Sequence, residues 1–271
     1  MSSYKTEIRD NMRIEWDVPI TMDDGLVLRA DVFRPVAEGK YPAIMSYGPY
    51  GKGLAFQEGY KTAWEIMARE FPDAVSGTSN KYQNWEVVDP ERWVPDGYIC
   101  IRIDARGWGR SPGYIEPWSP REARDMHDCI EWAGTQAWSN GKVGLLGISY
   151  YAINQWHAAG LQPPHLAAMI PWEVFADFYR DFAFHGGIGC DMKDVWYRRT
   201  TTTVQHGLGT RALKNRNTGE LVAGPDTLTD AELARNRSDF PGEINAHPLD
   251  DAFHRERSAH WDKVTVPFLS A

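Results

Sequence analysis

The residue whose type and setting best suit it to covalent chemistry is Ser149. It follows the apolar run 143–148 and precedes a helix-compatible stretch, in the order Gly147-Ile148-Ser149-Tyr150-Tyr151-Ala152. A serine on a sharp strand-to-helix turn projects its hydroxyl above the sheet, and such a turn requires small neighbours, as in G-x-S-x-G. Gly147 satisfies the first position, whereas Tyr151 replaces the second glycine. The setting predicts a nucleophile for acyl transfer, and the alternative that Ser149 merely caps a helix stays open.

Acyl transfer also requires hydrogen-bond donors for the oxyanion that forms in the transition state. One candidate is the backbone N–H of Tyr150, the residue after the serine. The other lies in the loop Gly48-Pro49-Tyr50-Gly51-Lys52, which follows an early apolar run. That loop could donate through its backbone or through the Tyr50 hydroxyl. A packing role for Tyr50 beside a Gly/Pro turn fits the pattern equally well.

Hydrophobic periodicity predicts the elements that hold these residues. Strands are expected at residues 13–22, 26–33, 41–47, 98–104, 143–148 and 166–171. Helices are expected at residues 60–70, 121–137 and 151–159. The turn signal Asp23-Asp24-Gly25 predicts a hairpin between the first two strands. Strands that alternate with helices over residues 41–171 predict an α/β fold with a mostly parallel sheet, covered on both faces.

The character of the chain changes after residue 171. Residues 1–171 are expected to form the N-terminal part of the α/β core, and residues 172–262, which contain few strand-like runs, to form a helical cap. Residues 263–271 are apolar again and predict a strand that returns to the core.

Composition narrows the class of protein. The formal net charge of −8 argues against a polyanion such as nucleic acid as the main partner. The N-terminus has no apolar signal region and no apolar run is long enough for a membrane span, so we expect a cytoplasmic protein. The widely spaced Cys100, Cys129 and Cys190 predict neither a disulfide framework nor a metal site. We expect no metal and no cofactor.

The 12 tryptophans exceed what a core of this size needs, so some of these rings are expected to line a pocket.

A second motif precedes the Ser149 turn, which in this fold is called the nucleophile elbow. The run Asp104–Gly113 (DARGWGRSPG) resembles the D-x-R-G-x-G-x-S-x-G signature of cocaine-esterase-like hydrolases, which group with Xaa-Pro dipeptidyl peptidases and α-amino-acid ester hydrolases. In that family a tyrosine follows the nucleophile and the second elbow glycine is often replaced. The resemblance covers residues 10–172 and 262–271, and the segment between them loosely. Further matching positions are Asp125, Asp128, Glu131-Trp132, Trp138–Gly141, Pro49-Tyr50 and Gly147–Tyr150.

The resemblance implies a Ser-His-Asp hydrolase with the α/β-hydrolase fold, an inserted helical cap and a C-terminal jelly-roll domain that lies outside this sequence. It implies Ser149 as nucleophile, with the Tyr50 hydroxyl and the Tyr150 amide as oxyanion donors. Small-molecule esters or amides are the implied substrates, amino-acyl and Xaa-Pro compounds included. Asp104 and Arg106 are expected to form buried pairs near the site.

Two members of the triad are not expected in this sequence. The chain order in the fold is serine, acid, histidine, and the resemblance places the Asp and the His beyond Ala271. This chain is therefore expected to be the front part of a longer enzyme. The later histidines fall in the expected cap and are not expected to replace the missing base; they are His185, His206, His247, His254 and His260. His127 and His157 are expected to be packed in core helices.

Two alternatives stay open. The acidic residues Asp177, Asp181, Asp191 and Asp194 of the expected cap could hold a substrate ammonium group, as the resemblance implies, or simply form a solvated helix face. Without a triad acid and histidine, the chain could also be a catalytically inactive α/β-hydrolase fold that binds a ligand. The sequence leaves the oligomeric state, a homo-oligomer included, undecided.

Overall fold

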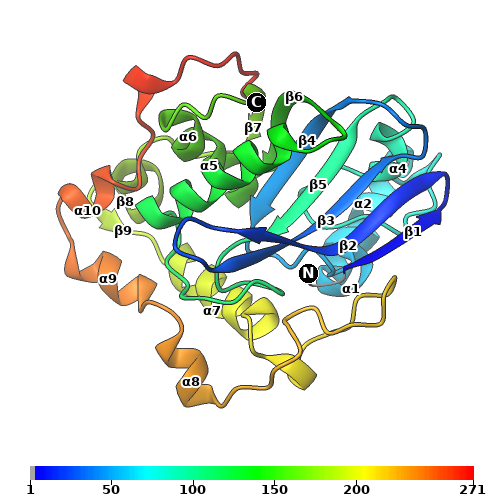
Figure 1. The fold of residues 1–271 in the computed structure, drawn as a ribbon. Coiled ribbons are helices and arrows are strands. Elements are labelled where there is room, and N and C mark those ends of the chain that lie inside the picture. The colour runs from blue at the N-terminus through cyan, green and yellow to red at the C-terminus, as the bar shows by residue number, and fades with distance from the viewer. Residues whose placement is uncertain (1–3) are drawn as a thin grey trace.

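The structure, a computed structural model, describes residues 4–271 and is built around one sheet. The strand order in the sheet is β1-β2-β3-β5-β4-β6-β7 (Figure 1). These strands are β1 (Lys5–Arg9), β2 (Met12–Thr21), β3 (Val27–Pro35), β4 (Tyr41–Gly48), β5 (Ile99–Asp104), β6 (Ser139–Ile148) and β7 (Leu166–Trp172). A separate two-stranded hairpin consists of β8 (Phe184–His185) and β9 (Ile188–Gly189).

The sheet has a parallel half and an antiparallel half. β5, β4, β6 and β7 run parallel to one another, which confirms the α/β arrangement predicted for residues 41–171. β1, β2 and β3 are antiparallel and join the parallel half through the antiparallel pair β3–β5. The predicted hairpin is present between β2 and β3. The short strand β1 was not predicted, because its five mostly exposed residues carry no hydrophobic alternation.

The helices connect the parallel strands and cover the sheet (Figure 1). The three predicted helices correspond to α2, α5 and α6, and α5 and α6 both pack against β6. The α-helices are α1 (Phe56–Gly59), α2 (Lys61–Glu70), α3 (Pro72–Val75), α4 (Pro90–Trp93), α5 (Pro120–Thr135), α6 (Tyr150–Gly160), α7 (Met192–Val204), α8 (Asp230–Arg235), α9 (Phe240–Ala246) and α10 (Ala252–Arg255). A π-helix, η1 (Phe178–Ala183), and two 3-10 helices, η2 (Gly209–Arg211) and η3 (Trp261–Lys263), complete the set.

The parallel strands are buried on both faces. In β5, Ile99, Ile101 and Ile103 belong to the larger hydrophobic cluster, whereas Cys100 belongs to a second cluster with residues of β2 and β3. Because successive side chains of a strand point to opposite faces, the two clusters lie on opposite sides of the sheet. This double burial explains why the parallel strands read as continuous apolar runs in the sequence.

The helical segment, here residues 173–262, follows β7 and contributes η1 and α7–α10. The chain then returns to the sheet. The Met169 N–H donates to the Pro267 carbonyl at 3.1 Å and the Leu269 N–H to the Met169 carbonyl at 3.1 Å, so the last residues run parallel beside β7. They form one isolated bridge at Phe268 rather than the strand predicted for residues 263–271, because the pairing extends over too few residues to make a strand.

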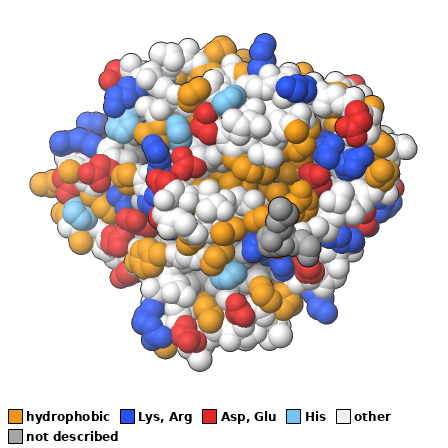
Figure 2. All heavy atoms as spheres, viewed as in Figure 1, with side chains coloured by type: hydrophobic (Ala, Val, Ile, Leu, Met, Phe, Trp, Pro, Cys, Tyr) orange, Lys and Arg blue, Asp and Glu red, His pale blue; other side chains and the backbone are white. Residues whose placement is uncertain are grey.

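On the outside of the molecule, acidic, basic and apolar side chains are interspersed over the face that Figure 2 shows. No helix within residues 4–271 combines the length and the apolar character needed to cross a bilayer.

Candidate active site

Ser149 occupies a strained backbone position between β6 and α6. Its φ of 57° and ψ of −120° lie outside the regions that non-glycine residues ordinarily adopt. Its N–H donates to the Trp172 carbonyl at 2.9 Å, which ties the turn to the end of β7. The Ser149 side chain makes no capping hydrogen bond to α6. Helix capping therefore does not account for this serine, and its hydroxyl is free for another role.

The turn is tight, and the residues around Tyr151 show how it is accommodated. A Cβ atom placed on Gly147 would lie 2.3 Å from the Tyr151 Cβ atom. A Cβ atom on Gly48, at the end of β4, would lie 2.7 Å from the Tyr151 ring. Two glycines thus provide the space that Tyr151 takes, and the second glycine of the usual elbow pattern is not needed here.

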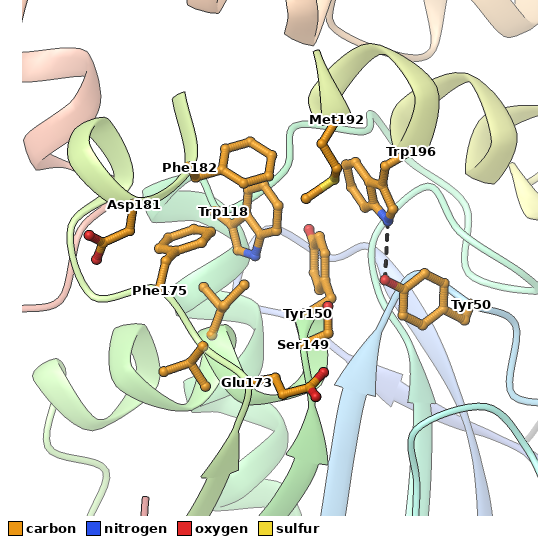
Figure 3. A pocket seen from close by; sticks show the side chains of 12 residues that line it. Tyr50, Trp118, Ser149, Tyr150, Glu173, Phe175, Asp181, Phe182, Met192 and Trp196 are labelled. Carbon is orange, nitrogen blue, oxygen red and sulfur yellow. Dashed lines mark hydrogen bonds between the residues drawn. The ribbon is translucent and has the colours of Figure 1, made fainter. Parts of the chain in front are cut away.

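The two candidate oxyanion donors lie at the same pocket as Ser149 (Figure 3). Tyr150 begins α6, and the first turn of a helix leaves its N–H groups without intrahelical acceptors. Tyr50 follows β4 and is buried. Burial, reinforced by the charge of Glu86, raises the pKa of Tyr50 well above its usual value, so the phenol keeps its proton. Both groups are therefore available as donors.

The pocket has a volume of about 310 Å³ and is mostly aromatic. Trp118, on the loop before α5, stacks on Tyr150 with 4.6 Å between ring centroids. Trp196 of α7 lies nearly parallel to both rings, at 5.3 Å from Trp118 and 5.5 Å from Tyr150. The residues that line the pocket are Tyr50, Trp118, Ser149, Tyr150, Ile153, Glu173, Val174, Phe175, Asp181, Phe182, Met192 and Trp196. Only the excess of tryptophan in the composition indicated this aromatic wall.

The phenol of Tyr150 is held by a buried carboxyl group. Its hydroxyl lies 2.9 Å and 2.7 Å from the two oxygens of Glu122, which also accepts the backbone N–H of Trp118 at 2.7 Å. Burial raises the pKa of Glu122 to about 8. Glu122 therefore fixes both aromatic residues of the stack, a role that the sequence pattern did not indicate.

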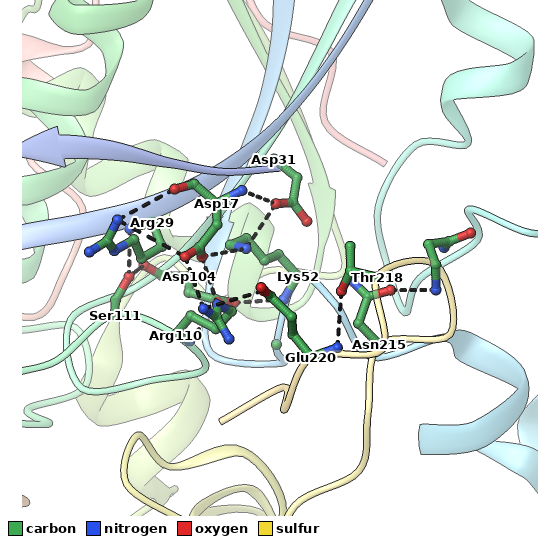
Figure 4. Close-up of polar contacts among 12 residues, drawn as sticks. Asp17, Arg29, Asp31, Lys52, Asp104, Arg110, Ser111, Asn215, Thr218 and Glu220 are labelled. Carbon is green, nitrogen blue, oxygen red and sulfur yellow. Dashed lines mark hydrogen bonds and ion pairs between the residues drawn. The ribbon is translucent and has the colours of Figure 1, made fainter. Parts of the chain in front are cut away.

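Behind the Tyr50 loop lies a buried charge cluster (Figure 4). The Asp104 carboxylate accepts the Lys52 N–H at 2.6 Å and the Arg110 N–H at 2.8 Å. The Lys52 ammonium lies 2.8 Å from Asp31 and 3.2 Å from Asp17. Burial opposes the charge of Lys52, but the three surrounding carboxylates outweigh it and raise its pKa. The cluster fastens the loop that carries Tyr50 to strands β2, β3 and β5.

Arg106 forms a separate buried pair. Its guanidinium binds Asp125 of α5 through two hydrogen bonds of 2.7 Å and 2.9 Å, and Asp24 of the β2–β3 turn at 2.9 Å. The buried pair expected for Arg106 is thus present, whereas Asp104 forms no direct ion pair within residues 4–271. Asp104 binds backbone amides and Arg106 binds carboxylates, and neither lines the Ser149 pocket.

None of the eight histidines, all within the described residues 4–271, lines the Ser149 pocket. His185 contacts the Asp181 carbonyl at 2.7 Å, and His206 contacts the Gly109 carbonyl at 3.0 Å. His157 is buried in α6, where its Nε2–H donates to the Arg257 carbonyl at 2.8 Å. No group of three or more potential metal-ligating side chains occurs within residues 4–271.

The four acidic residues considered for ammonium binding are not gathered at the site. Asp181 alone lines the pocket, and one of its oxygens accepts the N–H groups of Ala176 and Asp177 at 3.1 Å and 3.0 Å. Asp177 is paired with Arg180. Glu173, which the sequence did not single out, is exposed and lines the same pocket as Ser149 (Figure 3).

Known proteins resemble this chain over 63% to 99% of its length. The cocaine esterase of Rhodococcus sp. (strain MB1 Bresler) is 33% identical over 170 residues, which is 63% of this chain and 25% of that protein. The crystal structure of a CocE/NonD family hydrolase from Staphylococcus aureus matches 98% of this chain and 43% of its own, with 31% identity and a TM-score of 0.74. An α-amino acid ester hydrolase, 19% identical with a TM-score of 0.60, shares the fold.

These relatives are longer proteins, of which this chain spans a quarter to somewhat under a half. Their resemblance confirms the α/β-hydrolase fold. The family model for the X-Pro dipeptidyl-peptidase (S15 family) matches residues 24–271, nearly all of the chain. The chain therefore belongs to the S15 family.

Proposed function

We propose that this chain supplies the nucleophile and the oxyanion hole of a serine hydrolase that cleaves acyl esters or amides. The observation that carries the proposal is the strained Ser149 at the end of β6, with no capping role and with its place in the aromatic pocket. Membership of the S15 family and the resemblance to an esterase support it.

In the proposed reaction the Ser149 Oγ attacks the acyl carbonyl carbon, and the carbonyl oxygen becomes an oxyanion. The Tyr50 hydroxyl and the Tyr150 N–H donate to that oxyanion. The leaving alcohol or amine departs with the proton taken from the Ser149 hydroxyl, and water then hydrolyses the acyl-enzyme to release the carboxylic acid and restore the Ser149 hydroxyl. The histidine that takes the serine proton and the acid that orients it stay predicted beyond Ala271.

Labelling with a fluorophosphonate probe tests the nucleophile. The natural full-length polypeptide is expected to be labelled, and Ser149→Ala to abolish labelling and to lower ester hydrolysis by about 10⁴-fold or more. Ser76→Ala, a change at an exposed serine far along the chain from the elbow, serves as the control and should leave both unchanged. Unchanged labelling of the Ser149→Ala protein would overturn the proposal.

For the acyl group, we infer an α-ammonium substrate held by Glu173. Glu173 lines the same pocket as Ser149 and is exposed there, so its carboxylate would offer a counter-charge to a cation bound among the aromatic rings (Figure 3). Asp181 lies at the same pocket but is partly committed to backbone amides. An alanyl ester and its propionyl counterpart, together with a Gly-Pro anilide, separate the subclasses. Glu173→Gln should raise KM for the alanyl ester and leave the propionyl ester unaffected.

The alternative is an inactive α/β-hydrolase fold that binds its ligand without turnover. It is favoured by the absence of a histidine at the pocket within residues 4–271. Equilibrium binding of a small ester to the full-length polypeptide without release of alcohol or acid would support it. A cytoplasmic location also stays a prediction, which cell fractionation would test. Light scattering would determine the oligomeric state, which the sequence leaves undecided.

A further inference from the structure

One hydrogen bond joins the helical segment to the proposed oxyanion hole. The indole Nε1–H of Trp196, on α7, donates to the Tyr50 hydroxyl oxygen with 3.1 Å between nitrogen and oxygen (Figure 3). Trp196 is half-buried and Tyr50 is buried. The two residues are 146 positions apart in the chain, so the contact exists only when the helical segment is packed on the core.

The chemistry of the two groups fixes the direction of this bond. An indole N–H donates and cannot accept, whereas a phenol has one proton to donate and two lone pairs to accept with. Trp196 therefore occupies one lone pair of Tyr50 and cannot receive its proton. Within residues 4–271, Tyr50 makes no hydrogen bond as a donor, and its hydroxyl lies at the pocket with Ser149. The Tyr50 proton is thereby directed away from the indole, on the side where an oxyanion would form.

The indole is itself held in place. Its ring lies nearly parallel to the rings of Trp118 and Tyr150, with centroid distances of 5.3 Å and 5.5 Å. Tyr150 supplies the second oxyanion donor and Trp118 is fixed by Glu122. A donor on the phenol oxygen also polarises the O–H bond and strengthens the hydrogen bond that this O–H makes in turn.

We propose that Trp196 is a positioning residue, whose indole N–H orients the Tyr50 hydroxyl toward the oxyanion and so makes the helical segment a structural part of the oxyanion hole. The inference rests on the proposed function of Ser149 and Tyr50. It assigns Trp196 a polar role in addition to its contribution to the aromatic wall.

A double-mutant cycle in the full-length polypeptide tests this role. Trp196→Phe keeps an aromatic ring and removes the N–H. With Tyr50 present, it should lower kcat for an acyl ester by about tenfold, the value of one ordinary hydrogen bond, with a smaller change in KM. In the Tyr50→Phe background the same substitution should not lower kcat further, because there is no hydroxyl left to orient.

Trp118 offers a matched control. It belongs to the same stack, but its own indole N–H is buried without a hydrogen-bond partner within residues 4–271. Trp118→Phe should therefore change kcat by the same factor with and without the Tyr50 hydroxyl. If Trp196→Phe perturbs folding, replacement of Trp196 by 3-benzothienylalanine, which keeps the bicyclic shape without the N–H, should reproduce the Tyr50-dependent loss.

The possible outcomes distinguish failure of the positioning role of Trp196 from failure of the proposed function of Ser149. Equal losses from Trp196→Phe in both backgrounds, or a change confined to KM, would overturn the positioning role while Ser149 labelling stays intact. Ester hydrolysis that persists in the Ser149→Ala protein would instead contradict the proposed function itself.

Discussion

Tyr151 stands where the usual elbow pattern has a glycine, and the surrounding residues show what makes the larger side chain acceptable. The steric requirement moves to Gly147 and Gly48, both of which face Tyr151 at distances that exclude a Cβ atom. Gly48 gives way to the Tyr151 ring, whereas Gly147 gives way to the Tyr151 Cβ atom and backbone and makes the closer approach of the two.

A substitution on β6 tests this packing. In Gly147→Ala, the new Cβ atom would lie 2.3 Å from the Tyr151 Cβ atom and 3.1 Å from the Tyr151 backbone, so the turn must shift. We expect a loss of about 1–3 kcal/mol in the free energy of unfolding, together with reduced labelling of Ser149. Gly144→Ala, on the same strand, is the control, because its nearest contacts are 3.7 Å and 3.8 Å. Equal effects of the two changes in urea denaturation would contradict this account.

Glu122 predicts a pH dependence of stability. Burial raises its pKa from 4.5 to about 8, so the folded protein keeps a proton that the unfolded chain has already lost. The stabilising contribution is complete below pH 4.5 and is lost as the pH rises from there to about 8, on the order of a few kcal/mol. Glu122→Gln should flatten the fall of the unfolding free energy over that interval. The pKa values of Asp104 and Glu86 are also raised, so the natural protein and Glu122→Gln share part of the pH dependence. The test is therefore the difference between their two profiles of unfolding free energy against pH. Parallel profiles would show that Glu122 is ionised in the folded protein.

The loop between β4 and α1 depends on a charge cluster rather than on apolar packing. Lys52 lies between the carboxylates of Asp31 and Asp17, and its backbone N–H binds Asp104. These three acids come from three different strands or their ends. Because each carboxylate is wholly or largely buried, the cost of removing the lysine is the cost of leaving negative charge without a partner.

Lys52→Met measures that cost. We expect a loss of about 3–5 kcal/mol in the free energy of unfolding, since the side chain is only 3% exposed and its partners stay behind as charges. Lys61→Met removes an ion pair of 3.9 Å to Glu65 at a position that is 77% exposed, and should cost about 0.5 kcal/mol or less. Thermal or urea unfolding of both variants gives the comparison. A Lys52→Met protein as stable as Lys61→Met would show that the cluster contributes no net stability.

The parallel half of the sheet was predictable because each of its strands is a short apolar run between helical patterns. Local patterns also placed Ser149 on its turn. They could not reveal Trp196, Glu173 or Glu122 as neighbours of Ser149 or Tyr150. Trp196 and Glu173 belong to the helical segment, where tertiary packing rather than periodicity decides which side chains face the pocket. Glu122 lies on the predicted helix α5, but its contact with Tyr150 depends on how α5 and α6 pack together.

The core and the helical segment are coupled through His157, which links α6 to the residues after α10. Burial lowers its pKa from 6.5 to about 4. Between these two pH values, His157 is therefore neutral in the folded protein and mostly protonated in the unfolded chain. Its contribution is complete above pH 6.5 and is lost as the pH falls toward about 4, on the order of 3 kcal/mol. This slope is opposite in sign to that of Glu122.

His157→Gln, which keeps a side-chain N–H for the Arg257 carbonyl but does not titrate, should therefore resist acid better than the natural protein. Its unfolding free energy, measured by urea titration at pH 4.5 and pH 7, should fall less between the two values. His127→Gln is the control, because His127 lies on the half-buried side of α5 and contacts Asp128 rather than the helical segment. Both variants could instead lose as much unfolding free energy as the natural protein between pH 7 and pH 4.5. Protonation of His157 would then not limit the acid stability of the molecule. The contact between α6 and residue 257 would have to tolerate a charged imidazole.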